Sequence, residues 1–130
     1  MKLGVFAVLL SAKSLEESLS YLKESGVQAV ELGTGGYPGN AHVNPEVLLK
    51  DPKLIQQLKD LIGKYDMEIS ALSCHGNPVH PQKDIARSYH EDFKKTVLLA
   101  EKLGINRIAG FSGCPGDSEN SLYPNWVTCP

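Results

Sequence analysis

Long apolar runs, an excess of basic residues and an even set of cysteines are all missing from this sequence. No segment approaches the roughly 18 consecutive apolar residues that a membrane span needs, so we expect no association with a membrane. Thirteen Lys and Arg against fifteen Asp and Glu give a net charge of −2, which argues against a nucleic-acid partner. The three cysteines form no C-x-x-C pair. They predict reduced thiols and a cytoplasmic location rather than disulfides or a zinc site.

What the 130 residues do contain is a repeated alternation of strand and helix patterns, enough for one domain over residues 1–130. The expected strands are 3–10, 27–33, 67–73 and 107–112, and the expected helices start at Ser14, Asp51 and Asp84. The pattern repeats every ~35 to 40 residues, which predicts parallel strands joined by right-handed helical crossovers. The sequence therefore predicts an α/β fold of order β-α-β-α-β-α-β.

Local signals support the expected helices. Ser14 and Glu17 have the spacing of a capping box, and Asp51 followed by Pro52 is typical of a helix start. The third helix carries an apolar stripe that we expect to face the core: Ile85, Tyr89, Phe93, Val97 and Ala100.

The connections after the strands are long and rich in Gly and Pro, whereas those after the helices are short. Ligands of parallel α/β folds bind at the carboxyl ends of the strands, on the side of the long loops. Residues 113–130 include no helix pattern to cover the last strand. Because a (β/α)8 barrel needs roughly 250 residues, we interpret the chain as the first half of such a barrel. A complete four-stranded open sheet is the alternative.

His75 and Glu31 are the strongest candidates for a binding site. His75 directly follows the third expected strand, where an imidazole can bind a metal or transfer a proton near neutral pH; the alternative is a loop histidine bonded to local backbone. Glu31 lies within an apolar strand, where a carboxylate is costly unless it is paired or faces a polar cavity. Strand alternation places it opposite Val30 and Leu32, toward the barrel interior. A structural ion pair with Arg107 is the alternative.

Other candidates carry weaker signals. His42 and His80 lie on long loops, and His80 could join His75 in a metal pair, although nothing in the sequence fixes that loop. His90 is expected on the outer face of the third helix. The glycines of residues 33–36 could hold a phosphate, but no known phosphate-loop pattern is present.

Aromatic residues are expected near the mouth of the site. Tyr37, Phe111 and Trp126 could pack against the apolar face of a sugar, although core packing is the commoner role for a residue such as Phe111. Asn77 follows His75 in the same loop. Cys114 lies in a turn beside no evident base, so we do not expect it to be a nucleophile.

Three segments resemble the sugar phosphate isomerase/epimerase family, which has the xylose-isomerase-like TIM barrel and shares it with ketose 3-epimerases and endonuclease-four-type enzymes. They are G-V-Q-A-V-E-L at 26–32, L-S-C-H-G-N-P at 72–78, and F-S-G-C-P-G at 111–116 with Y-P-N-W at 123–126. The resemblance covers essentially the whole chain but only the N-terminal part of the family's length.

The resemblance implies proton transfer next to the carbonyl of a sugar or sugar phosphate, assisted by a divalent metal (Mn, Mg, Co or Zn). The family's metal ligands and acid–base glutamates lie on strands five to eight, which have no counterpart here, so no catalytic residue is assigned. It implies a substrate-binding role for His75 and Glu31, and we place Asn77, Phe111 and Trp126 with them. We therefore expect residues 1–130 alone to show little or no turnover.

Two other functions remain open. One is a metal-dependent phosphodiesterase of the endonuclease type, in which the histidine of the third strand is itself a metal ligand. The other is a non-catalytic α/β module that forms a homodimer through its open strand edges.

Overall fold

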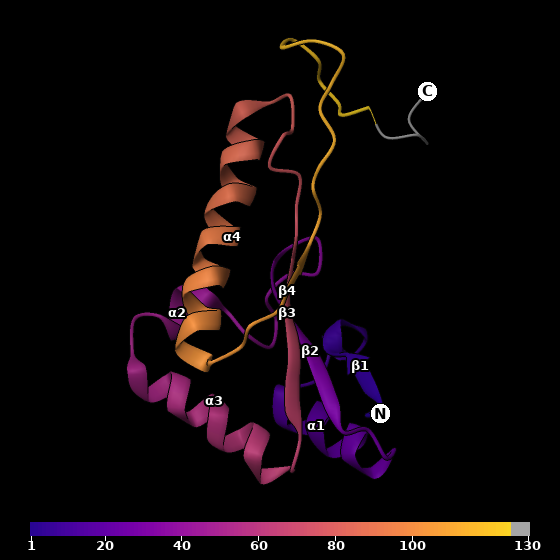
Figure 1. Cartoon of the computed structure of the whole chain (residues 1–130), viewed down its shortest axis with the longest axis vertical. Coiled ribbons are helices and arrows are strands. Elements are labelled where there is room, and N and C mark those ends of the chain that lie inside the picture. Colours follow the sequence, from indigo (N-terminus) through magenta and orange to yellow (C-terminus); the bar gives the residue numbers. More distant parts are fainter. Residues whose placement is uncertain (126–130) are drawn as a thin grey trace.

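The computed structural model describes residues 1–125, which form a four-stranded parallel sheet with helices between the strands (Figure 1). The strand order is β1-β2-β3-β4, and every pair is parallel, as the alternating pattern predicts. The elements are β1 (Gly4–Phe6), the 3-10 helix η1 (Ala7–Leu10), α1 (Leu15–Glu24), β2 (Ala29–Gly36), α2 (Pro45–Leu48), α3 (Pro52–Lys64), β3 (Glu68–His75), α4 (Lys83–Leu103) and β4 (Ile108–Gly110).

All four strands have limits that differ from the sequence prediction: β3 includes His75, which was expected to follow the strand, and β4 ends at Gly110 rather than at residue 112. The differences are largest in β1 and β2. β1 ends at Phe6 rather than residue 10, because the next four residues form a 3-10 helix that buries Ala7. An apolar run alone does not distinguish these two conformations. β2 continues to Gly36, so the glycine-rich segment 33–36 belongs to the sheet rather than to a loop. Its glycines pair with β3 through Ser73 and His75, with register shifts where the backbone bulges.

The helix starts are mostly as predicted. Ser14 and Glu17 form both hydrogen bonds of a capping box, and Asp51 caps α3 with Pro52 in its first turn. The predicted cap of α4 is wrong. The N-cap residue is Gln82, and Asp84 lies inside the first turn. Gln82 caps with no side-chain bond because its amide donates to the carbonyl of Leu122 instead.

The core lies between the sheet and the helices. Its largest completely buried side chains come from α1, β2, β3 and α4: Leu19, Val30, Leu32, Leu72 and Leu99. Each of them is enclosed by neighbours on the helix-covered face of the sheet, so this face is the continuous hydrophobic core.

The predicted core stripe of α4 is only partly buried. Ala100 is buried, but Phe93 and Val97 are 41% and 44% exposed. The helix packs on β2 and β3 through Thr96 and Leu99, and its first half extends beyond the ends of the strands (Figure 1). A spacing pattern identifies an apolar face but does not tell how much of that face meets the sheet.

In the described part of the chain, the two outer strands each bond to one neighbour, so β1 and β4 present open edges. None of the helices described is both long and apolar enough to cross a membrane.

Candidate functional site

Glu31, Ser73 and His75 lie on the face of the sheet opposite the hydrophobic core. Side chains alternate along each strand, and Leu32 and Cys74 next to them are buried on the helix side. The hydroxyl of Ser73 donates a hydrogen bond to the carboxylate of Glu31, which links β2 to β3 on this face. Glu31 therefore points where the sequence predicts, toward the interior of the barrel that such a sheet would form.

The Glu31 carboxylate is half-buried and has Phe6 and Ala71 as its register partners on β1 and β3. The alternative ion pair is not formed, because Arg107 donates from Nε to the carbonyl of Ser70 at 3.0 Å. A carboxylate has about four acceptor positions, and Ser73 occupies one of them. Glu31 can thus accept further hydrogen bonds from the hydroxyls of a ligand.

His75 is the last residue of β3, and its ring contacts two phenyl groups. It stacks on Phe111 with ring centroids 4.6 Å apart and an interplanar angle of 13°. Phe6 meets it edge-on at 6.1 Å. No hydrogen bond joins the imidazole to any other part of residues 1–125 in the structure. Phe111 covers one face of the imidazole, and the ring nitrogens have no hydrogen-bond partner among these residues and could bind a ligand.

The stacked pair continues into a row of aromatic rings across the strand ends. Phe111 lies 6.2 Å from Tyr37, and Tyr37 lies 5.5 Å from Tyr89. Sequence reasoning missed Tyr89, which periodicity placed in the core, and also Phe6 and Ser73. Nothing local distinguished these residues, since Phe6 lies in the middle of the strand expected over residues 3–10 and only the structure ends β1 there.

The pKa of the Tyr89 phenol is raised, which favours its protonated form. A side-chain hydrogen bond with Tyr37 raises its pKa to about 12, with smaller contributions from burial and from the negative charges that Tyr37 and Asp92 can carry. Because the pKa is raised in the folded state, the resulting stability is complete below the ordinary value of about 10 and is lost as the pH rises through about 12.

We expect Tyr37→Phe to lower the pKa of Tyr89 toward about 10, because the partner hydroxyl and its charge are removed. The tyrosine ring carbons, followed by ¹³C NMR between pH 8 and 13, would report this. The exposed Tyr21 on α1 offers a matched control, since Tyr21→Phe removes a hydroxyl far from the aromatic row. An unchanged titration of Tyr89 in the first variant would contradict the assigned cause.

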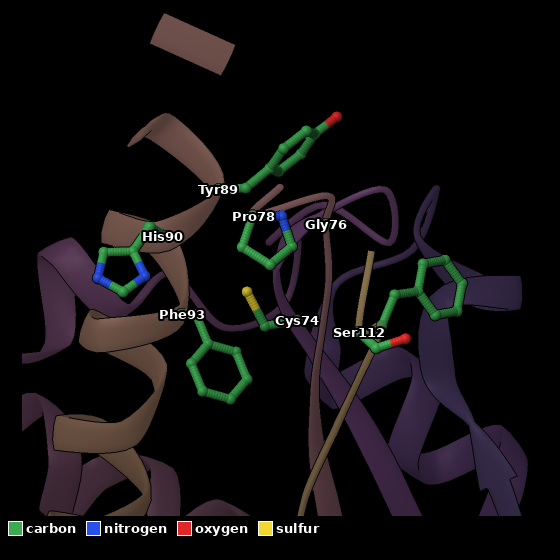
Figure 2. A pocket seen from close by; sticks show the side chains of 8 residues that line it. Cys74, Gly76, Pro78, Tyr89, His90, Phe93 and Ser112 are labelled. Atoms are coloured by element: carbon green, nitrogen blue, oxygen red, sulfur yellow. The ribbon is translucent and has the colours of Figure 1, made fainter. Parts of the chain in front are cut away.

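Next to this row lies a cavity of about 310 Å³ between α4 and the ends of β3 and β4 (Figure 2). Tyr89, His90 and Phe93 line it from the helix, and Cys74 and Ser112 line it from the strand side. His90 was expected on the outer face of the helix, and it borders this cavity while remaining exposed. Burial raises the pKa of the Cys74 thiol, which keeps it protonated and unreactive near neutral pH.

The other histidines have local roles. His42 places Nε2 3.0 Å from the carbonyl oxygen of Lys13 and 3.4 Å from the Ser18 hydroxyl. His80 accepts a hydrogen bond from the backbone N–H of Gln82 at 3.0 Å. Within residues 1–125, His, Cys, Asp and Glu side chains form no group of three or more that could hold a metal. The described residues therefore do not by themselves make a divalent-metal site.

Asn77 is completely buried, and both ends of its amide bind the backbone of Cys114. Direct contact between Asn77 and a substrate stays a prediction. Trp126 lies outside the described residues, so its predicted role is not addressed.

Comparisons with known proteins agree with the fold. The family model of the xylose isomerase-like TIM barrel matches residues 19–128. An uncharacterized protein of Bacillus subtilis, YfiH, is 30% identical over 128 residues, which is 98% of this chain and 41% of that protein. The crystal structure of the probable 3-DHS dehydratase AsbF, involved in petrobactin synthesis, from Bacillus anthracis superposes with a TM-score of 0.59 at 19% identity. The match covers 87% of this chain and 39% of the AsbF chain.

The chain thus spans about two-fifths of the length of both proteins. The likeness to AsbF, at 19% identity, bears on the fold alone. With a matching family model over most of its length and a parallel sheet of the expected order, the chain belongs to the xylose isomerase-like TIM barrel family.

Proposed function

We propose that this chain forms the substrate-binding wall of an enzyme that moves a proton next to the carbonyl of a sugar or sugar phosphate, as an isomerase or epimerase does. One observation carries the proposal. Glu31 and His75 lie on the same open face of adjacent strands, and His75 is stacked on Phe111 where the strands end. This is the end at which enzymes of barrel folds bind their substrates.

The two faces of a sugar match these groups. The C–H groups of the ring or chain pack on an aromatic face such as Phe111, and the hydroxyls can donate to the Glu31 carboxylate and bond to the edge of the imidazole. The half-exposed ring of Phe111 and the exposed ring of Tyr37 lie side by side and offer a continuous aromatic surface. An extended polyhydroxylated chain would therefore fit better than a compact ion.

The reaction needs more groups than the described residues supply. Moving a proton from one carbon to the other face or to the next carbon requires a base, a group that returns the proton, and donors or a metal for the enediolate oxygen. Residues 1–125 offer one carboxylate and one imidazole on this face. We expect residues 1–130 alone to turn over well below ~1 s⁻¹.

A divalent cation (Mn, Mg, Co or Zn) remains part of this proposal for an enzyme with all the required groups. The described residues bring together no set of ligands that could hold it.

Two observations favour other functions, which the experiment below also tests. The open edges of β1 and β4 favour pairing with a second copy, which is the homodimer expected of a non-catalytic module. The fold of AsbF, a probable dehydratase, makes loss of water from a hydroxy ketone a second reaction worth measuring. A phosphodiesterase remains the third outcome.

The decisive experiment measures exchange of the hydrogen next to the carbonyl with solvent deuterium. A panel of ketoses and ketose phosphates in D₂O, with each of the four cations in turn, is followed by ¹H NMR, which also reports epimers and dehydrated products. The samples are residues 1–130 and the longest polypeptide that the gene encodes. We expect exchange in the polypeptide that has all the required groups. Glu31→Gln should lower its kcat/KM by about 10- to 100-fold, because a hydrogen bond from a substrate hydroxyl to a charged group contributes about 1.5–3 kcal/mol.

The matched control is Glu68→Gln, since Glu68 is an exposed carboxylate at the opposite end of β3 and should leave the rate unchanged. Sizing of residues 1–130 and hydrolysis of a phosphodiester dye are measured on the same samples. If no sugar exchanges hydrogen in either sample, the proposal is wrong, and a dimer or diester hydrolysis would identify which alternative replaces it.

A further inference from the structure

The buried amide of Asn77 performs the task of a backbone peptide group. The ladder between β3 and β4 pairs Ser73 with Ala109 and Cys74 with Gly110, and there it ends. Three residues further along, the side chain of Asn77 donates from Nδ2 to the carbonyl of Cys114 at 2.8 Å and accepts at Oδ1 from its N–H at 3.0 Å. One amide thus bonds both polar groups of one residue, and it resumes the pairing beyond the end of the sheet.

The neighbouring backbone is built to admit this contact. Gly113 has φ +92°, and a Cβ atom there would lie 2.6 Å from Oδ1 of Asn77 and 2.8 Å from Val79. A side chain at position 113 would therefore both strain the backbone and push the amide away from Cys114. Asn77 itself has no exposed surface. The free-energy cost of burying this amide is small only because both its oxygen and its nitrogen form hydrogen bonds.

Phe111 lies between the two points at which this segment is held. Gly110 pairs with Cys74 on one side of it, and Cys114 is bonded to Asn77 on the other. The phenyl ring itself is half exposed, yet it stacks face to face on His75. Because half of the ring is exposed, we expect the fixed backbone on both sides to contribute to this geometry.

We propose that Asn77 is a positioning residue of the substrate site. By bonding Cys114 it holds Phe111 over His75, so that the row of aromatic rings is already in place before a ligand binds. The effect of Asn77 on substrate binding rests on the function proposed above, whereas its effect on the position of Phe111 does not. Asn77 then acts through Phe111 and need not touch the substrate.

The direct test uses the NMR signals of the His75 ring in residues 1–130. A phenyl face at 4.6 Å shields the imidazole protons, and Phe111→Leu gives their unshielded position. We expect Asn77→Ala to move the His75 signals more than half of the way to that position. Gln82→Ala is the matched control. It removes another amide bond to the same loop, at Leu122, and should leave the signals in place.

A measurement on the unmodified chain guards against loss of folding in Asn77→Ala. The N–H of Cys114 should exchange with solvent as slowly as the N–H groups of the β3–β4 ladder, because it donates to the side chain of Asn77, which is completely buried. Exchange as fast as that of the exposed Asp117 would overturn the proposal. So would His75 signals that stay at their original position in folded Asn77→Ala.

The kinetic test separates this inference from the proposed function. In a polypeptide with the proposed activity, Phe111→Leu and Asn77→Ala should each raise KM about tenfold with little change in kcat, since a stacking wall binds ground state and transition state alike. The double variant should be no worse than Phe111→Leu alone. Additive effects would contradict action through Phe111. If no activity exists, the proposed function fails, while the NMR and exchange results still decide the role of Asn77.

Discussion

Gly36→Ala is expected to lower the free energy of unfolding by about 2–5 kcal/mol and to displace His75. Gly36 ends β2 with φ +68°, a left-handed conformation that costs an L-residue about 1–2 kcal/mol. A Cβ atom there would lie 2.0 Å from the carbonyl oxygen of His75. That oxygen also accepts the backbone N–H of Tyr37 at 2.7 Å. Forcing the strands apart adds about 1–3 kcal/mol.

Gly39→Ala provides a control with the same backbone strain. Gly39 has φ +69°, but no atom lies within 4 Å of the position its Cβ would take. Only the cost of the left-handed conformation, about 1–2 kcal/mol, should appear. Denaturant unfolding followed by circular dichroism measures both variants, and the His75 NMR signals should move only in Gly36→Ala. Equal losses of stability would show that the close approach to His75 does not determine the packing of β2 on β3.

Leu99→Ala is expected to lower the free energy of unfolding by about 2–5 kcal/mol, which is a large part of the ~5–15 kcal/mol available to a domain of this kind. Leu99 has no exposed surface and belongs to the core cluster beneath β2 and β3. Its removal leaves a cavity where α4 meets the sheet, because a close-packed interior relaxes only in part.

The adjacent Leu98 is the control, because it is 51% exposed on the same helix. Leu98→Ala should change the free energy of unfolding by no more than about 0.5 kcal/mol. Both substitutions have the same chemistry and nearly the same helix propensity effect, so their difference measures burial. Similar losses for the two would mean that α4 packs on the sheet by a different face.

Several features of the fold could be predicted because they depend on short-range interactions. The capping box of Ser14 and the start of α3 at Asp51 each involve bonds within one turn of helix. The parallel strand order follows from the alternation of strands and helices with short returns. Strand alternation also placed Glu31 on the correct face.

The residues at which strands and helices begin and end could not all be predicted, because some are set by contacts with residues distant in the sequence. The glycines that end β2 become strand only because β3 lies beside them and accepts their pairing. Gln82 caps α4 without a side-chain bond, since Leu122 on a distant loop holds its amide. The apolar stripe of α4 reaches past the sheet, so Phe93 borders a cavity instead of the core.

The sequence by itself determined the class of the fold, the face of the sheet on which Glu31 lies and the place of His75 near the end of its strand, because each follows from a local period or from chain order. That these two residues belong to a substrate site remains a proposal. Only the tertiary structure decided what these residues meet: Ser73 against the carboxylate, Phe6 and Phe111 around the imidazole, and Asn77 against Cys114. Such contacts join residues 36 to 69 positions apart, and their energies come from distances that exist only after the strands have paired.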